Sequence, residues 1–220
     1  MNNKIFIVIP AFNEEEVIED VLNQIQKNGY KNIIIVDDGS FDQTYQKIIN
    51  KNVTVLRHIL NRGKGAAIKT GIEAAKILGA DSVITFDGDG QHDPADIEKI
   101  QNHLKQYDVV LGTRSYKDLP KLKKILNILG NLSTFLIYGL WVKDSQSGLR
   151  GFSKKALFCI NTQNDRYEYD SEVIREIGKN KLKYIEIPIK VKYTKYSQEK
   201  LNKQGIYNGL KTVLKMIISA

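Results

Sequence analysis

The feature that most constrains this chain is the alternation, through its first half, of short apolar runs with amphipathic segments of helical spacing. The runs are rich in β-branched residues, a composition typical of buried strands. We expect strands at residues 5–9, 33–36, 53–56, 82–86 and 108–112. Strands that alternate with helices of this length predict an α/β fold, with a mostly parallel, Rossmann-like sheet and helices on both faces.

Side chains typical of helix starts follow three of these strands. We expect a capping box that begins at Asn13, a second that begins at Ser40, and a cap at Asp93 with Pro94 at the first helical position. Pro10 is expected to end the first strand, because proline lacks the N–H that a strand ladder uses.

The second half of the chain has a different pattern. Residues 121–142 are rich in Leu and Ile and predict a helix that either packs into the core or lies on a membrane surface. A late strand is expected at residues 185–191, and residues 206–218 carry an apolar stripe typical of an amphipathic helix. We see no linker or repeat, so residues 1–220 are expected to form a single domain.

The cysteine content and the hydropathy narrow the class of protein. Cys159 is the sole cysteine, which excludes an internal disulfide framework and a cysteine metal cluster and fits a reducing, cytoplasmic location. The first residues lack the pattern of a signal peptide. No run of about 18 apolar residues is present, so a transmembrane helix is not expected.

The net charge of +8 lies near the C-terminus, since residues 179–220 hold ten lysines and two acids. A basic region of this kind predicts a phosphate-bearing partner, namely anionic lipid, nucleic acid or a phosphorylated substrate, or is only a solvated surface. The near-neutral remainder of the chain argues against a nucleic-acid-binding module.

Three acidic segments are expected at the carboxyl edge of the sheet, where open α/β sheets bind their ligands. They are Asn13-Glu14, Asp37-Asp38 and Asp87-Gly88-Asp89. Each could simply form a turn or cap a helix. Carboxylates gathered at one edge repel each other unless a cation neutralises them, and oxygen ligands suit Mg²⁺ or Mn²⁺. The three histidines lack the spacing of a zinc site.

Six motifs follow one another along almost the whole chain. They are Ile9-Pro10-Ala11-Phe12-Asn13-Glu14, Val36-Asp37-Asp38-Gly39-Ser40, Asn61-Arg62-Gly63-Lys64-Gly65, Asp87-Gly88-Asp89-Gly90-Gln91-His92-Asp93-Pro94, Gly112-Thr113-Arg114 and Asp144-Ser145-Gln146-Ser147-Gly148-Leu149-Arg150. In this order the motifs resemble those of the family 2 glycosyltransferases, which have the GT-A fold. The resemblance is closest to the dolichyl- or polyprenyl-phosphate sugar synthases, of the dolichol-phosphate mannose synthase type.

The resemblance implies an inverting, metal-dependent hexosyltransferase. Residues 1–115 would bind a UDP- or GDP-sugar, and residues 116–220 would face the acceptor and the membrane. Family members bind the nucleotide sugar at positions that match Pro10, Ala11, Asn13, Glu14, Asp38, Lys64, Asp87 and Gln91. Asp87 and Asp89 match the ligands of the metal, Mg²⁺ or Mn²⁺, and the implied catalytic residues are Asp89, Arg114 and Arg150.

The resemblance also implies a polyprenyl (dolichyl or undecaprenyl) phosphate as acceptor, bound by Arg114, Arg150, Ser197 and Lys200. Such an acceptor implies peripheral contact with an anionic membrane surface on its cytoplasmic side, with a homodimer or a membrane-protein partner as further options. The alternative acceptor is a saccharide or glycolipid hydroxyl, which needs a carboxylate base. Candidates for that base are Glu168, Asp170 and Glu172.

Overall fold

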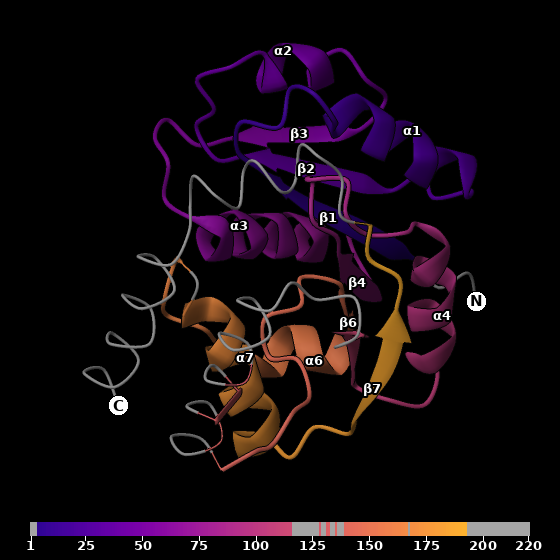
Figure 1. The fold of residues 1–220 in the computed structure, drawn as a ribbon, viewed down its shortest axis with the longest axis vertical. Coiled ribbons are helices and arrows are strands. Elements are labelled where there is room, and N and C mark those ends of the chain that lie inside the picture. Colours follow the sequence, from indigo (N-terminus) through magenta and orange to yellow (C-terminus); the bar gives the residue numbers. More distant parts are fainter. Residues whose placement is uncertain are drawn as a thin grey trace.

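The computed structural model describes residues 4–115, 128, 131, 132, 135, 139–166 and 168–192. Its centre is a seven-stranded sheet of order β3-β2-β1-β4-β6-β5-β7 (Figure 1). The strands are β1 (Ile5–Ala11), β2 (Ile33–Asp37), β3 (Thr54–Arg57), β4 (Ser82–Thr85), β5 (Val109–Arg114), β6 (Arg150–Ser153) and β7 (Tyr184–Ile189). All neighbours pair in parallel except β6, which is antiparallel to β4 and β5. The predicted α/β fold with a mostly parallel sheet is confirmed.

Helices cover both faces of this sheet. They are α1 (Ile18–Lys27), α2 (Thr44–Ile48), α3 (Lys64–Ile77), α4 (Ala95–His103), α6 (Lys154–Cys159) and α7 (Glu168–Lys179). Successive side chains of a strand point to opposite faces. In β1, Phe6 and Val8 pack with α3, α6 and α7, whereas Ile7 and Ile9 pack with α1, α2 and α4.

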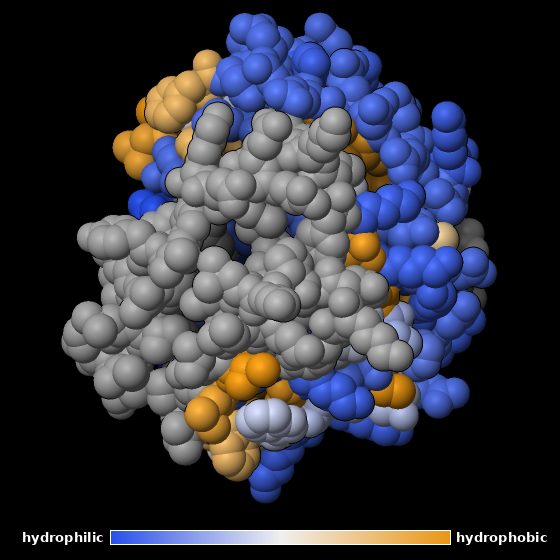
Figure 2. Space-filling view, in the orientation of Figure 1, coloured by the Kyte–Doolittle hydropathy of each residue, from blue (hydrophilic) through white to orange (hydrophobic). Residues whose placement is uncertain are grey.

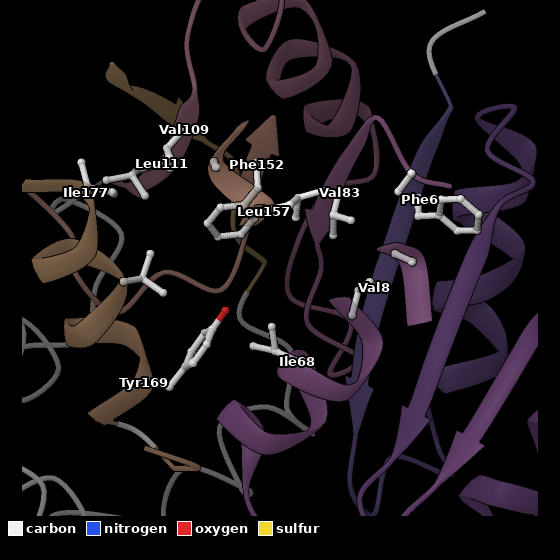
Figure 3. Packing of buried hydrophobic residues seen from close by; sticks show 14 of the residues in the cluster. Phe6, Val8, Ile68, Val83, Val109, Leu111, Phe152, Leu157, Tyr169 and Ile177 are labelled. Carbon is white, nitrogen blue, oxygen red and sulfur yellow. The ribbon is translucent and has the colours of Figure 1, made fainter. Parts of the chain in front are cut away.

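The layer formed by α3, α6 and α7 brings distant parts of the chain together (Figure 3). Ile68 of α3, Phe152 of β6 and Tyr169 of α7 are all buried in one cluster, where each large apolar side chain contributes about 1.5–3 kcal/mol. Gly71 lets α3 lie close to β1, because a Cβ there would overlap the side chain of Val8. The start of α3 is thereby fixed above the carboxyl edge of the sheet.

The predicted strands agree with the structure within one or two residues, apart from the end of β1. Pro10 does not end this strand, which continues to Ala11. The ladder between β1 and β4 stops at the pair Val8–Thr85, so the missing N–H of Pro10 interrupts no bond on that side.

Two of the three predicted helix caps are wrong. Neither Asn13 nor Ser40 caps a helix, because the two residues bond to each other's loops instead. The N–H of Asn13 donates to Oγ of Ser40 at 2.9 Å, and Oδ1 of Asn13 accepts from the N–H of Phe41 at 3.0 Å. For the third, the N-cap of α4 is Pro94 and not Asp93, one residue later than predicted, although Oδ1 of Asp93 accepts from the N–H of Ala95 at 3.0 Å.

In the second half, β6 and α6 are elements that the sequence did not predict. Within the predicted helix 121–142, residues 128, 131, 132 and 135 are helical, but the helix does not reach residue 142 as expected. Gly139 has a φ of 72°, a conformation typical of a helix end. The predicted helix at residues 206–218 lies outside the described residues. In the part of the chain that the structure describes, no helix is both long and apolar enough to span a bilayer.

Candidate active site

The candidate site lies at the carboxyl ends of β1, β2 and β4. The chain leaves β1 toward β2 on one side and reaches β4 on the other, and such a switch of direction opens a crevice at the sheet edge. The segments after these strands are adjacent: the N–H of Asp38 donates to the carbonyl of Ala11 at 2.8 Å, and a Cβ at Gly88 would lie 3.0 Å from the carbonyl oxygen of Pro10. The three acidic segments therefore meet at one edge, as the sequence predicts.

Asp87 is the most strongly paired carboxylate of this edge. Its Oδ1 lies 2.7 Å from Nζ of Lys64, and its Oδ2 lies 3.3 Å from Nε2 of His92. Burial of Asp87 disfavours its charged form, but Lys64 and His92 outweigh burial and hold the pKa of Asp87 well below its usual value. Burial likewise opposes the charge of Lys64, whose pKa is nevertheless raised by the carboxylates of Asp87 and Asp170.

The carboxylate of Asp87 fits into a space that a side chain at residue 148 would fill. A Cβ added to Gly148 would overlap both oxygens of Asp87. The segment around Gly148 is held in place by Thr85, whose Oγ1 donates to the carbonyl of Gly148 at 2.7 Å. The glycine is therefore required by close approach to Asp87, and its φ is not positive.

Asp89 and Gln91 form the second part of the same loop. Oδ2 of Asp89 accepts from Nε2 of Gln91 at 2.6 Å, and Oδ1 accepts from the N–H of Gln91 at 3.1 Å. The carbonyl of Gln91 accepts from the N–H of Lys192 at 2.8 Å, which ties the loop to the segment after β7. The carboxylate of Asp89 is therefore fixed by Gln91, and the loop is anchored at the sheet edge.

Asp38 organises the loop that leads to Lys64. Its Oδ1 accepts from Nδ1 of His58 at 2.7 Å and from the N–H of Arg62 at 3.0 Å, and its Oδ2 accepts from the N–H of Gly63 at 2.7 Å. Gly63 has a φ of 112°, a value that residues with a side chain rarely adopt, and it directly precedes α3. The expected contact of Asp38 with the nucleotide stays a prediction, whereas its contacts with this loop are direct.

Arg150 is a deeply buried cation near the site, with 2% of its surface exposed. Its guanidinium donates to the carbonyls of Ser147 at 2.8 Å and Ser145 at 2.6 Å, and Nη2 lies 3.0 Å from Oδ1 of Asp170. Burial raises the pKa of Asp170, while Arg150 and Lys64 act in the opposite direction. In this arrangement Arg150 holds residues 145–147 against the start of α7.

Arg114, at the end of β5, makes a two-pronged ion pair with Asp144. Its Nε lies 2.7 Å from Oδ2 and its Nη2 lies 2.8 Å from Oδ1 of this carboxylate. The side chain of Arg114 is 16% exposed and that of Asp144 is 2% exposed. The ion pair is therefore mostly buried, with Arg114 as its more exposed partner.

Three acidic residues lie at the start of α7, and all of them are buried: Glu168, Asp170 and Glu172. Oε2 of Glu172 accepts from the N–H groups of Gln163 at 2.9 Å and Asn164 at 2.8 Å, so Glu172 holds the loop before α7. The predicted acceptor residues Ser197 and Lys200 lie outside the described residues.

The oxygen ligands that the loop after β4 offers fit a hard divalent cation. Among the described residues, no three His, Cys, Asp or Glu side chains are gathered around one point as for a metal held by protein alone. Mg²⁺ is commonly bound by one or two carboxylates together with substrate phosphates. Asp87 and Asp89 would supply two carboxylates in that manner, and the first of them lies against Gly148, where a side chain would displace it.

Three residues of this site had no role predicted from the sequence. His92 contacts Asp87, Gly148 makes room for the same carboxylate, and Asp144 holds Arg114. All three residues lie within the motifs quoted above, and this position was the only sign in the sequence that they belong to the site. Their contacts could not be predicted, because the partners lie up to 61 residues away along the chain, as for Asp87 and Gly148.

Several known proteins are similar to this chain in sequence. The profile described as Glycosyl transferase family 2 matches residues 6–160. An uncharacterised protein of Methanocaldococcus jannaschii is 44% identical, over 98% of this chain and 92% of its own length. The UDP-N-acetylglucosamine–dolichyl-phosphate N-acetylglucosaminyltransferase of Methanococcus voltae is 43% identical, over 88% of this chain and 87% of its own.

A solved structure shares the fold at much lower sequence identity. Glucosyl-3-phosphoglycerate synthase from Mycobacterium tuberculosis, in complex with Mn²⁺, UDP and phosphoglyceric acid, superposes with a TM-score of 0.70 at 16% identity. The match covers 96% of this chain and 78% of that protein.

Proposed function

Because the chain belongs to glycosyl transferase family 2, we propose that it moves one sugar from a UDP- or GDP-sugar to a polyprenyl phosphate. The observation that carries the choice of acceptor is the 43% identity, over 88% of the chain, to the Methanococcus voltae enzyme that acts on dolichyl phosphate. An acceptor phosphate oxygen would form a bond to the anomeric carbon as the bond to the nucleoside diphosphate breaks, which inverts that carbon.

The contacts of Asp170 and Glu172 support a phosphate acceptor over a hydroxyl acceptor. A hydroxyl must lose a proton to a carboxylate within hydrogen-bond reach, whereas a phosphate monoester, with a second pKa of about 6, is already largely ionised near neutral pH. Asp170 is paired with Arg150, and Glu172 binds two backbone N–H groups and Arg175. Neither carboxylate is available as a base without loss of these contacts.

The donor would lie along the edge formed by the loops after β1, β2 and β4. Asp87 and Asp89, with Gln91 beside them, would hold a divalent metal, Mg²⁺ or Mn²⁺, whose charge stabilises the leaving nucleoside diphosphate. The fold relative from Mycobacterium tuberculosis was solved with Mn²⁺ and UDP, which supports a metal of this type. The nucleotide contacts proposed for this chain involve Pro10, Ala11, Asn13, Glu14, Asp38 and Lys64.

An exposed apolar stripe supports docking of the enzyme at the cytoplasmic face of a membrane. Ile128, Leu132 and Phe135 have 46%, 43% and 41% of their surface exposed, and Trp141, 51% exposed, meets the ring of Phe135 edge-on at 5.7 Å. On the face drawn in Figure 2 the described surface is mostly hydrophilic, and hydrophobic side chains gather at its top left and at its bottom. An apolar face with an aromatic side chain at its border is typical of interfacial helices.

The same helix is joined to the site through Asn131. Its Nδ2 donates to the carbonyl of Lys143 at 2.6 Å, and its Oδ1 accepts from the N–H of Ser145 at 2.9 Å. Ser145 is in turn bound by Arg150. A helix that rests on lipid would therefore place the site close to a lipid-linked phosphate.

A transfer assay tests the proposed activity. Purified protein with Mn²⁺ or Mg²⁺ would be offered UDP- and GDP-sugars, with and without a short polyprenyl phosphate. We expect one donor to be consumed only when the lipid phosphate is present, and EDTA to stop the reaction until metal is restored. Slow donor hydrolysis that the lipid phosphate does not change, or transfer to a saccharide hydroxyl, would contradict the proposed acceptor.

Membrane docking has a separate test. The double variant Leu132→Ser, Phe135→Ser should sediment less with anionic vesicles, because each substitution removes apolar surface from the proposed contact. Transfer to a short, water-soluble polyprenyl phosphate should stay near the wild-type rate. Equal sedimentation of the variant and the wild type would contradict docking through this stripe.

A further inference from the structure

The ammonium of Lys64 is paired with Asp87, one of the two proposed metal ligands. Nζ of Lys64 lies 2.7 Å from Oδ1, and the other oxygen of the carboxylate faces His92 at 3.3 Å. The side chains of Lys64 and Asp87 are 25% and 21% exposed, so a donor can reach the pair from the sheet edge. Both oxygens of the proposed metal ligand therefore already have partners within the protein.

Lys64 is held at this place by the fold and not by a ligand. It begins α3, which lies close to β1 because of Gly71, and it follows Gly63, whose N–H is bound by Asp38 at 2.7 Å. The carbonyl of Asp165 accepts from the N–H of Ala66 at 2.9 Å and fixes the first turn of α3 from the other side. The ammonium is thus built into the site beside Asp87.

We propose that Lys64 is the resident counter-ion of Asp87, and that a divalent metal binds this site tightly only together with a nucleoside diphosphate. A metal ion alone would bring two positive charges beside a fixed ammonium, and like charges at short range oppose each other. A diphosphate brings the negative charge that offsets both cations and gives Lys64 a second anionic partner. The inference rests on the proposed function for the metal and the donor, but not for the acceptor.

The binding order that follows differs from that of a preformed metal site. The free enzyme keeps Asp87 neutralised by Lys64, so divalent metal does not occupy the site at low concentration. The donor and the metal then enter as one complex, and Lys64 moves from the carboxylate toward the diphosphate. Such thermodynamic coupling between two ligands commonly amounts to roughly 5–150-fold in affinity.

Mn²⁺ binding, followed by electron paramagnetic resonance, tests this inference without any transfer reaction. MnCl₂ would be titrated into the wild type, Lys64→Met and Lys64→Arg, each with and without UDP and, in parallel, GDP. Without nucleotide we expect Lys64→Met to bind Mn²⁺ roughly tenfold more tightly than the wild type, because Asp87 loses its competing cation. Lys64→Arg keeps the charge and should bind Mn²⁺ as weakly as the wild type.

Lys69→Met is a matched control on the same helix. Lys69 pairs with Asp165 at 2.5 Å, away from Asp87, so its loss should leave the nucleotide-free affinity for Mn²⁺ unchanged. Nucleotide-free Mn²⁺ binding by a folded Lys64→Met protein that is equal to or weaker than that of the wild type would overturn the inference. If Lys64→Met does not fold, the Mn²⁺ affinity of the wild type alone tests the inference. Equal affinity of the wild type with and without nucleotide would also refute the inference. Failure of polyprenyl phosphate as an acceptor would leave these results intact.

Discussion

A methyl group at residue 148 should disable the site while the fold remains. In Gly148→Ala the new Cβ would overlap both carboxylate oxygens of Asp87, whereas an ordinary contact lies at 3.4–4 Å. The carboxylate must therefore move by about 1 Å, and a displacement of that size can cost about 100-fold in rate when it misplaces a catalytic group. We expect kcat/KM for sugar transfer to fall by about 100-fold, with weaker binding of Mn²⁺ in the presence of UDP.

Gly178→Ala is the matched control for this substitution. Gly178 lies in α7, its Cβ would meet only side-chain atoms of Leu140 at 4.0 Å, and alanine is favoured over glycine within a helix by about 0.5–1 kcal/mol. This control should keep the wild-type rate and gain slightly in thermal stability. A Gly148→Ala enzyme with wild-type kcat/KM and an unchanged circular dichroism spectrum would refute the view that Gly148 sets the position of Asp87.

Two further predictions concern other ion pairs. Arg114→Lys should lower the free energy of unfolding in urea by about 1–3 kcal/mol, because an ammonium cannot replace the two-pronged contact with Asp144; an unchanged urea midpoint would contradict this. Burial opposes ionisation of Asp108, but the N–H of Lys183 and the ammonium of Lys155 outweigh it and hold the pKa of Asp108 below its usual value. Since the folded pKa is the lower one, this carboxylate adds stability above about pH 4 and loses it as the pH falls. The stability difference between the wild type and Asp108→Asn should therefore shrink between about pH 5 and pH 3 in urea titrations, and a constant difference would contradict the assignment.

The strands could be predicted because their physical cause is local. Runs such as residues 33–36 are apolar on both faces, as a central parallel strand requires, and β2 is buried along its whole length. β6 lacks such an apolar run, since it begins with a charged Arg150 and continues with Gly151, and it was therefore not predicted. Its burial depends on antiparallel pairing between β4 and β5, which no local pattern announces.

The predicted caps at Asn13 and Ser40 failed because distant partners were better placed. Asn13 and Ser40 have the side chains that cap helices, but the loops after β1 and β2 lie side by side at the sheet edge. Each polar group therefore bonds across to the other loop, and α1 begins later, at Ile18. A capping signal read from sequence assumes that nothing else competes for the same side chain.

The same limit applies to the site. The sequence alone identified the carboxylates of Asp87 and Asp89, since an acidic loop at the end of a strand is visible in one segment. It could not show that Lys64, which begins a different helix, pairs with Asp87, or that Asp170 of α7 pairs with Arg150. These pairs depend on packing between α3, α7 and the sheet, which fixes where the charges lie.

The pairing of the two arginines constrains how an anionic acceptor can be held. A phosphate that recruited Arg150 would have to replace Asp170, and loss of one partner of a buried ion pair costs about 3–5 kcal/mol. Arg114 is the more accessible of the two arginines, since 16% of its side chain is exposed against 2% of that of Arg150. We infer that Arg114 is the direct contact of the acceptor phosphate, and that Arg150 acts through residues 145–147, whose carbonyls it holds against α7.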